Sequence, residues 1–293
     1  MRVAILCLAL VVSVTPICQA RTFVVPDECA TINEALKQAK PGDTVQINPG
    51  TYDESLYLCG TSINIVGAGA DKVIIRGSAT ASGPVLGLDG VYETVVSGCT
   101  FEQYDISDKL PASRYGTAGI NNSWAEIRQC SFRNSAADGI YIVGETLARV
   151  TECQFSKTAW SGISVQGKAC TATLDHNTFG DDCAITLIGV RNGATCTIEH
   201  NSGGQSSSDG ILISDPGTSA VIRNNTIADN DKHGIQIIAG AHAELENNTC
   251  TGNRLSGISV DGGAEARIHN NTCSDNSQNG IAISLSDAMA EGN

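Results

Sequence analysis

Short runs of alternating hydrophobic and polar residues recur along the chain. Typical runs are GISV, AVIR, AELE and ARIH, and segments rich in Asn, Asp, Gly and Ser separate them. Alternation with a period of two is typical of a strand with one buried face, and the intervening residues favour turns. The pattern therefore predicts an all-β protein built from many short strands.

These predicted strands repeat with a period of about 23 residues. The segment NNTC at 247–250 returns 23 residues later at 270–273. Gly-Ile pairs begin at Gly119, Gly139, Gly162, Gly210, Gly234, Gly257 and Gly280, and Ala184-Ile185 takes this place in one repeat. A second column contains Cys99, Cys130, Cys153, Asn177, Asn201, Asn225, Asn248 and Asn271. One unit of this size cannot bury its own hydrophobic face, but stacked copies can.

The period predicts a single-stranded parallel β-helix in which each repeat forms one coil. Equivalent residues of neighbouring coils then lie about 4.8 Å apart, at the spacing of hydrogen-bonded strands. The Asn column is expected to form a ladder of side-chain amides at a turn. Leucine-rich repeats are the alternative, but their Leu-rich signature and helical segments are absent from the sequence.

The N-terminus differs from the repeats. Residues 1–20 combine one Arg, an apolar run and small residues before Ala20, which is typical of a secretory signal peptide. Residues 21–62 are expected to form an N-terminal cap and the first coil, and 63–293 the repeats. In the cap, Thr31 and Glu34 have capping-box spacing, and Pro41 follows the predicted helix. This short α-helix would cover the open end of the solenoid.

The charge balance limits the partners of the protein. The net charge is -13, from 31 acidic and 18 basic residues. Nucleic acids and anionic membranes require clustered Lys and Arg, so neither is an expected partner. No segment after residue 20 is apolar enough to insert into a membrane. The cysteines do not form Cys-x-x-Cys pairs, which argues against a zinc ribbon, and no cofactor is expected.

The cap and the repeats together resemble a known family. The segments KPGDTVQINPGTYDESLYL and INIVGAGADKVIIRG, followed by the GI and NN repeats, are similar to pectin-lyase-like secreted proteins with right-handed parallel β-helix repeats. The resemblance covers residues 22–293 and implies a right-handed coil. Members include polysaccharide lyases, hydrolases, esterases and epimerases, and also repeat proteins without demonstrated catalysis.

Three segments resemble motifs of one branch of that family, the polygalacturonases. FGDDCAITL resembles their paired-Asp motif, SDGILI their Asp-Gly-Ile segment, and KHGIQI their Gly-His-Gly motif at the His-Gly pair. The resemblance implies catalytic carboxylates at Asp181, Asp182 and Asp209. It also implies that His233 orients the pair. Glycoside hydrolysis requires two such carboxylates, one of them as acid.

The order of these motifs departs from the polygalacturonase pattern. The paired Asp comes first, Lys232 replaces the Gly before the His, and no basic pair follows. Ser161, Ser256 and Asn279 also stand directly before Gly-Ile pairs, where turn residues are favoured. The alternative to a catalytic site is therefore a row of turn-forming residues.

A second constellation contains two histidines. His176 and His200 stand 24 residues apart, beside Asp175 and Glu199. Imidazoles near carboxylates are typical ligands of zinc or copper, but a zinc site needs three or four converging ligands. Because both histidines occupy the column that continues at Asn224, we interpret them as turn residues and expect no metal.

Aromatic residues concentrate in the N-terminal repeats. Tyr141 points outward by the alternation of its strand, and Trp124 and Trp160 lie in the flanking repeats. The interval of 31 residues between Cys99 and Cys130 contains an insertion, YDISDKLPASRYG. A protruding loop beside exposed rings predicts a sugar-stacking surface formed by Tyr141, Trp160 and Trp124. The alternative is an ordinary loop packed over a coil edge.

The cysteine positions predict crosslinks. Cys250 and Cys273 occupy the same place in successive repeats, which predicts Cα atoms about 5 Å apart, within disulfide range. A reduced pair stacked in the core is the alternative. The other candidate pairs are Cys170 with Cys196 and Cys29 with Cys59.

The chain ends at SDAMAEGN, part-way through a repeat and without a capping segment. Uncovered strand edges predict a frayed last coil or end-to-end self-association, unless the chain is a fragment. For the whole protein we expect secretion and the binding or processing of an extracellular polysaccharide. The alternative is a non-catalytic structural or adhesive surface protein.

Overall fold

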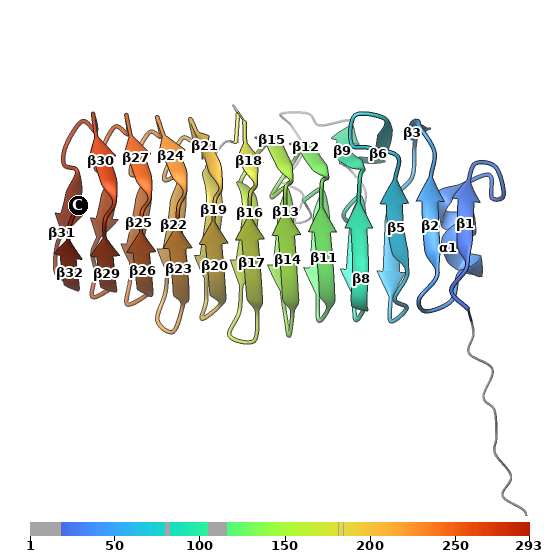
Figure 1. Cartoon of the computed structure of the whole chain (residues 1–293), viewed down its shortest axis with the longest axis horizontal. Coiled ribbons are helices and arrows are strands. Elements are labelled where there is room, and N and C mark those ends of the chain that lie inside the picture. Colours follow the sequence, from blue (N-terminus) through green and yellow to red (C-terminus); the bar gives the residue numbers. More distant parts are fainter. Residues whose placement is uncertain (1–18, 80–82, 105–115, 181, 184) are drawn as a thin grey trace, which may run out of the picture.

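The chain winds into a long solenoid whose coils follow one another along a single axis (Figure 1). The computed structural model describes residues 19–79, 83–104, 116–180, 182–183 and 185–293. The strands form three sheets, and every strand pairing between neighbouring coils is parallel. This is the parallel β-helix that the repeat predicts. The expected signal peptide, apart from Gln19 and Ala20, lies outside the described residues.

Each coil crosses the three sheets in the order A, B, C. Sheet A contains β1 (Thr22–Val25), β2 (Thr44–Ile47), β5 (Asn64–Gly67), β8 (Tyr92–Ser97), β11 (Trp124–Arg128), β14 (Leu147–Thr151), β17 (Thr171–Asp175), β20 (Thr195–Glu199), β23 (Ser219–Arg223), β26 (His242–Glu246), β29 (Glu265–His269) and β32 (Asp287–Glu291). Sheet B contains β3 (Gly50–Tyr52), β6 (Val73–Ser78), β9 (Thr100–Tyr104), β12 (Ser131–Ser135), β15 (Gln154–Thr158), β18 (Thr178–Phe179), β21 (Ser202–Gly204), β24 (Thr226–Ala228), β27 (Thr249–Thr251) and β30 (Thr272–Ser274). Sheet C contains β4 (Leu56–Cys59), β7 (Leu86–Asp89), β10 (Ala118–Asn121), β13 (Ile140–Val143), β16 (Ser161–Gln166), β19 (Thr186–Arg191), β22 (Ile211–Ser214), β25 (Ile235–Ile238), β28 (Ile258–Val260) and β31 (Ile281–Ile283).

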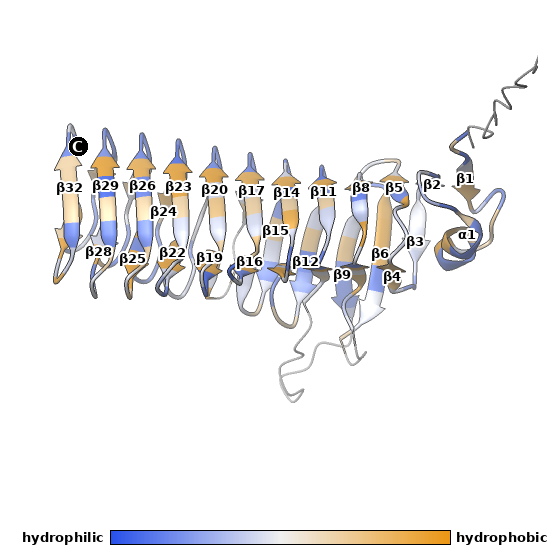
Figure 2. Cartoon of the chain, turned by 90° about the horizontal axis from the view of Figure 1, so that it is seen from below, coloured by the Kyte–Doolittle hydropathy of each residue, from blue (hydrophilic) through white to orange (hydrophobic). Residues whose placement is uncertain are grey.

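The core fills the inside of the solenoid. Inward residues such as Ala220 and Ile222 of β23 are buried, and the residues between them face outward, which gives the strands their banded hydropathy (Figure 2). One cluster of buried hydrophobic residues runs from Phe23 to Ile268, across the expected boundary at 62/63. The cluster includes a stack of four rings, Phe101, Phe132, Phe155 and Phe179, with successive centroids 5.4, 5.4 and 4.9 Å apart.

The Asn column forms the predicted ladder. The Nδ2 of Asn201 donates to Oδ1 of Asn225 at 3.0 Å, and Asn225 donates to Asn248 at 2.9 Å. The same amides bond backbone groups of the adjacent coils, such as the Asn201 N–H and the Ile198 carbonyl, and so give buried polar groups of the turn between sheets A and B their partners. A second ladder, through Asn230 and Asn253 at 2.8 Å, was not identified from the sequence.

The strand register shows that two of the positions assigned to the Gly-Ile column were wrong. Ser161 pairs with Thr186 and Ile163 with Ile188, so Leu187-Ile188 takes the Gly-Ile place rather than Ala184-Ile185. Accordingly, Ile185 is 43% exposed rather than inward. Ala118 pairs with Ile140, so Gly119-Ile120 is shifted by two residues from its expected place. In both coils more residues separate register-matched positions of sheets B and C than in the coils after residue 200, and the period alone does not reveal this.

The capping helix is present as predicted. Helix α1 (Ile32–Gln38) lies beside β1 and β2 at one end of the solenoid (Figure 1). Thr31 is the N-cap, and its side chain accepts a hydrogen bond from the Glu34 N–H at 3.1 Å. The carboxylate of Glu54 accepts the N–H groups of Ile32 and Asn33, both at 2.9 Å, which places a negative charge at the positive end of the helix. In the described ranges, no helix has the length and apolar character needed to cross a membrane.

All ten cysteines in the described part of the chain carry free thiols. Cys250 and Cys273 lie directly opposite each other in β27 and β30, as expected. In the last coil, Leu285 and Met289 are exposed. The expected disulfides and the end-to-end self-association stay predictions.

Candidate functional site

A row of polar residues lies where the strands of sheet C begin, one residue in each of six successive coils. Its members are Asp138, Ser161, Thr186, Asp209, His233 and Ser256. Several of these side chains accept a hydrogen bond from the backbone N–H of the next member. The Oδ1 of Asp138 accepts from Ser161 at 2.9 Å, and Oδ1 of Asp209 accepts from His233 at 3.1 Å. The row therefore ties successive coils together at a turn.

Two members of this row, Asp209 and His233, are residues for which the polygalacturonase resemblance implied catalytic roles. Asp209 is 2% exposed and its carboxylate is bonded to the His233 backbone, while the His233 Nδ1 accepts the Ser256 N–H at 3.1 Å. Burial lowers the pKa of His233, against the opposing effect of the nearby Asp209 charge. These are the properties of turn-forming residues, the alternative drawn from the sequence.

Asp182 does not join this row. Because Leu187-Ile188 is the true Gly-Ile equivalent, Thr186 occupies the row position and Asp182 precedes it by four residues. Asp182 therefore does not stand in line with Asp209. Asp181 lies outside the described residues. The structure thus brings Asp209 and His233 together, and it places Asp182 elsewhere.

A groove of about 550 Å³ opens on the outer face of sheet C, over β13, β16 and β19. Its lining contains Asp138, Tyr141, Trp160, Ser161, Ser164, Gln166, Ile185 and Arg191. In register, Tyr141 lies opposite Ser164, and Ser164 lies opposite Gly189. A Cβ at Gly189 would lie 3.7 Å from the Arg191 guanidinium and 3.8 Å from the Ser161 hydroxyl, so a larger side chain at this position would project among the lining residues. A ring-lined trough with several polar groups is typical of ligand sites.

The charged groups of the groove are Asp138 and Arg191. Asp138 is 7% exposed, and burial raises the pKa of its carboxyl, although its bonds to Ser161 and the charge of Arg191 act in the opposite direction. A carboxyl that holds its proton to higher pH suits a general acid. Arg191 has no salt bridge to an acidic side chain in the described ranges, so its charge is available to an anionic ligand.

Two of the three aromatic residues of the predicted sugar-stacking surface lie together in the structure. Tyr141 and Trp160 line the same groove, and Trp160 is 40% exposed. Trp124 lies on β11 of sheet A, on another face of the solenoid, and is not part of the groove. Residues 105–115 of the insertion lie outside the described residues. Whether these rings bind sugar stays a proposal.

Sequence reasoning missed Asp138 and Arg191. Asp138 precedes Gly139-Ile140 just as Asp209 precedes Gly210-Ile211, so the same signal was present in both coils. The polygalacturonase resemblance, however, points to Asp209 rather than Asp138, and in that family's pattern the basic pair follows the His motif. The sequence does not identify Arg191, because the pattern of a strand does not show which neighbours an outward-facing residue contacts.

A smaller cavity of about 340 Å³ lies on sheet A. Its charged side chains pair with one another, as Arg223 does with Glu244 and Glu246, and Arg267 with Glu244. These groups are exposed and already matched, so the groove on sheet C is the better candidate site.

Comparison with solved structures finds the same architecture in proteins of very different sequence. An alginate lyase from Paenibacillus sp. str. FPU-7 superposes with a TM-score of 0.71 at 16% identity, over 91% of this chain and 99% of that one. The catalytic unit of a GH87 alpha-1,3-glucanase from Streptomyces thermodiastaticus strain HF3-3 superposes with a TM-score of 0.51 at 13% identity, over 85% of this chain and 64% of that one. At such identities the likeness concerns the fold alone.

Comparison with curated proteins finds no match. The family described as right-handed beta helix region matches residues 56–202 and 181–293, which together cover most of the chain. The stacked coils, the Asn ladders and this match agree, and the chain belongs to the right-handed β-helix family.

Proposed function

We propose that the protein binds an extracellular polysaccharide in the groove over β13, β16 and β19, and that it processes this glycan there. The observation that carries the proposal is the convergence of two rings, a buried acid and an arginine in one open trough. Sugar rings present C–H faces to aromatic side chains and hydroxyls to groups such as Ser161, Ser164 and Gln166. A solved structure of the same architecture is an alginate lyase, which adds support.

Arg191 indicates the class of sugar. Its guanidinium can hold a carboxylate with two parallel hydrogen bonds, so we propose a polysaccharide that contains uronic acids. The net charge of -13 opposes contact of a polyanion with the rest of the surface. Recognition is therefore concentrated at Arg191. In hydrolysis, Asp138, with its raised pKa, donates a proton to the glycosidic oxygen as the bond from that oxygen to the anomeric carbon breaks. A water molecule forms the new bond to the anomeric carbon, and the proton that it releases restores the Asp138 carboxyl.

The two tryptophans provide the test, because the chain contains no others. In a Trp124→Phe variant, fluorescence reports only Trp160 of the groove; in Trp160→Phe it reports only Trp124. Titration with alginate or polygalacturonate should change the Trp160 signal and leave the Trp124 signal constant. Gly189→Leu should block binding, since the backbone there has ordinary dihedral angles and the new side chain enters the trough.

Arg191→Gln should weaken uronate binding by about tenfold or more, as loss of a charge-assisted pair implies. A neutral glucan that binds equally well would refute the uronate assignment but keep the groove. For turnover, Asp138→Asn should abolish product formation while binding persists, and wild-type activity should fall as pH rises through the raised pKa of Asp138. Binding without turnover in the wild type would favour the non-catalytic surface protein.

A further inference from the structure

A cluster of two histidines and an aspartate lies at the turn between sheets A and B, away from the groove on sheet C. Asp175 ends β17, His176 follows it, and His200 follows β20 one coil further on. His176 and His200 have φ of 54° and 55°, and Asn224 has φ of 55° in the next coil. The two histidines therefore occupy the turn column that the sequence assigned to them.

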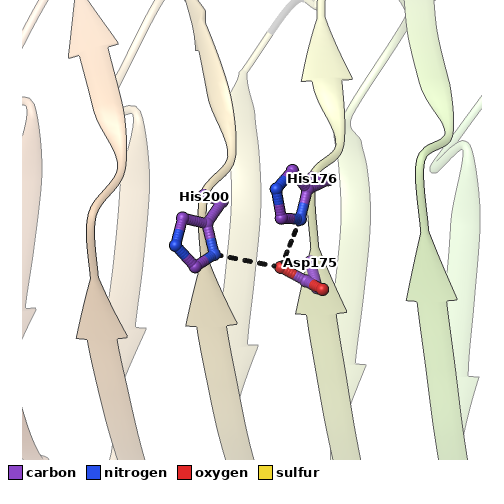
Figure 3. Close-up of side chains that lie close together, drawn as sticks. All are labelled: Asp175, His176 and His200. Carbon is purple, nitrogen blue, oxygen red and sulfur yellow. Dashed lines mark hydrogen bonds and ion pairs between the residues drawn. The ribbon is translucent and has the colours of Figure 1, made fainter.

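Their side chains, however, do not bond the turn. Figure 3 shows both imidazoles directed at the same carboxylate. The Nδ1 of His176 lies 2.7 Å from Oδ1 of Asp175, and the Nδ1 of His200 lies 3.2 Å from that oxygen. The two rings stack with centroids 4.6 Å apart and planes 19° apart. Three ligand atoms thus lie within 4.8 Å of one another.

These distances are close to those of a metal site. Zinc binds imidazole nitrogen and carboxylate oxygen at about 2.0–2.2 Å, so the ligand atoms of a tetrahedral site lie about 3.3–3.5 Å apart. The Asp175–His200 distance of 3.2 Å nearly meets this value, and the Asp175–His176 distance of 2.7 Å must open slightly. The rings must also tilt toward each other so that both lone pairs meet. The histidine side chains are 58% and 43% exposed, which leaves room for this rotation.

The surrounding side chains fit the same role. Arg149 lies 3.5 Å from Oδ2 of Asp175, which leaves Oδ1 turned toward the imidazoles. The amide of Asn224 lies 3.4 Å from Nε2 of His200. Metal ligation through Nδ1 makes Nε2 a donor, and turning the amide end for end would present its oxygen to that N–H. Such a contact fixes the orientation of a ligating ring.

We propose that Asp175, His176 and His200 bind a divalent transition-metal ion of the zinc, nickel or copper class, with water completing the coordination. Two nitrogen ligands favour these ions over calcium and magnesium, which prefer oxygen. Because the ligands come from successive coils, the ion joins β17 to β20 outside the sheet. The site is independent of the groove and of the polysaccharide proposal.

The repeat supplies variants that preserve the turn. His176→Asn and His200→Asn place in each coil the residue that already stands at the same backbone position in the following coils, as at Asn224 and Asn247. The matched control is His242→Ser, since His242 pairs in register with Ser219 and is not among the three clustered ligands. All proteins carry Cys59→Ser and no polyhistidine tag, because Cys59 is an exposed thiol that would bind zinc.

The measurement is calorimetric titration of the full chain with zinc chloride, followed by the spin-resonance spectrum of the Cu²⁺ form. We expect one zinc ion per chain, an affinity lower by at least about tenfold in either His→Asn variant, and no change in His242→Ser. The Cu²⁺ spectrum should show coupling to two imidazole nitrogens and lose one of them in each variant. Asp175→Asn should weaken binding in the same way.

Unfolding temperatures without metal verify that the variants remain folded. Zinc binding of equal strength in the wild type and both His→Asn variants would overturn the proposal, as would the absence of binding to the wild type. Equal loss in His242→Ser would show that the ion is held by scattered surface histidines, which also overturns it.

Discussion

In the row of polar residues at the start of the strands of sheet C, the position of a residue and its surroundings have separate effects on its role. Asp138 and Asp209 stand at equivalent places, and each accepts the backbone N–H of the next coil through Oδ1. Asp138 also borders the groove beside Trp160 and Arg191, whereas Oδ2 of Asp209 contacts the Ser208 hydroxyl at 3.2 Å. The shared position is structural, and only the neighbours make Asp138 a candidate for chemistry.

The His233 side chain should make the fold sensitive to acid. Burial lowers its pKa, so the unfolded chain binds a proton that the folded chain does not, and stability falls as pH drops below about 6.5. Protonation would also remove the Nδ1 acceptor used by the Ser256 N–H. His233→Ser, which copies Ser256 and Ser161 of the same row, should lose less stability on acidification. Unfolding temperatures at about pH 7.5 and about pH 5 test this.

Other carboxylates and histidines contribute to the pH dependence, so the comparison is between the two proteins at each pH. His269→Ser provides a control, because His269 is an exposed histidine outside the row. Identical acid losses in wild type and His233→Ser would contradict the assigned cause.

Within most coils, a tight turn followed by a ladder residue connects the strand of sheet A to the strand of sheet B. The turn residue has φ near 55° at His200, Asn224 and Asn247, and the next residue enters the Asn ladder. In earlier coils the ladder position is Cys, and the Cys153 thiol contacts the Ile127 carbonyl at 3.7 Å, much as the Asn amides contact carbonyls. The amide bonds more groups than the thiol, so the Asn coils gain more from this position.

Asn225→Ala should be strongly destabilising. Its Oδ1 accepts the Asn201 N–H, and its Nδ2 reaches the Ile198 and Arg223 carbonyls, all at 2.9 Å. Buried groups left without partners cost about 1–3 kcal/mol each, so we expect a loss of at least about 2 kcal/mol. The measurement is the free energy of unfolding in urea, with circular dichroism as the signal that reports unfolding.

Two further variants serve as comparisons for Asn225→Ala. Asn225→Cys, which copies the earlier coils, should fall between wild type and Asn225→Ala. Asn224→Gly changes an exposed neighbour at positive φ, where glycine is unstrained, and should cost only a few tenths of a kcal/mol. A change in Asn225→Ala as small as in Asn224→Gly would refute the role of the ladder.

At the scale of the whole molecule, stability comes from contacts between neighbouring coils, and each coil meets only the two beside it. A crosslink between adjacent coils therefore has a local effect. Cys250 and Cys273 are the pair best placed for one, since they face each other in register. The hydrogen bond with Cys250 lowers the pKa of Cys273, which makes its half-buried sulfur the attacking thiolate.

Under oxidising conditions we expect a Cys250–Cys273 disulfide. It closes a loop of 23 residues and should add at most about 3.4 kcal/mol of stability, which a reductant removes. Peptide mapping without reduction identifies the bond, and Cys250→Ser serves as the control that shows no gain on oxidation. Finding Cys250 bonded to a distant cysteine such as Cys99 would contradict the stacking register.

The solenoid, the capping helix and the Asn ladder follow from the sequence alone, because each depends on a pattern that the chain repeats or on a local signal such as Thr31 and Glu34. Register errors arose only where the number of residues between sheets B and C changes, at Gly119 and at Ala184, since hydrogen bonding between coils, not spacing along the chain, fixes the pairing.

The candidate site was decided by the tertiary structure. The polygalacturonase resemblance pointed to the row that contains Asp138, but to the coils of Asp209 and His233, whereas the groove lies near Asp138. Outward side chains are free of the periodic constraint that marks the core, so the sequence does not show which of them meet. The groove forms because three coils place Tyr141, Ser164 and Gly189 in one row with Arg191 near its end, and only the register brings them together.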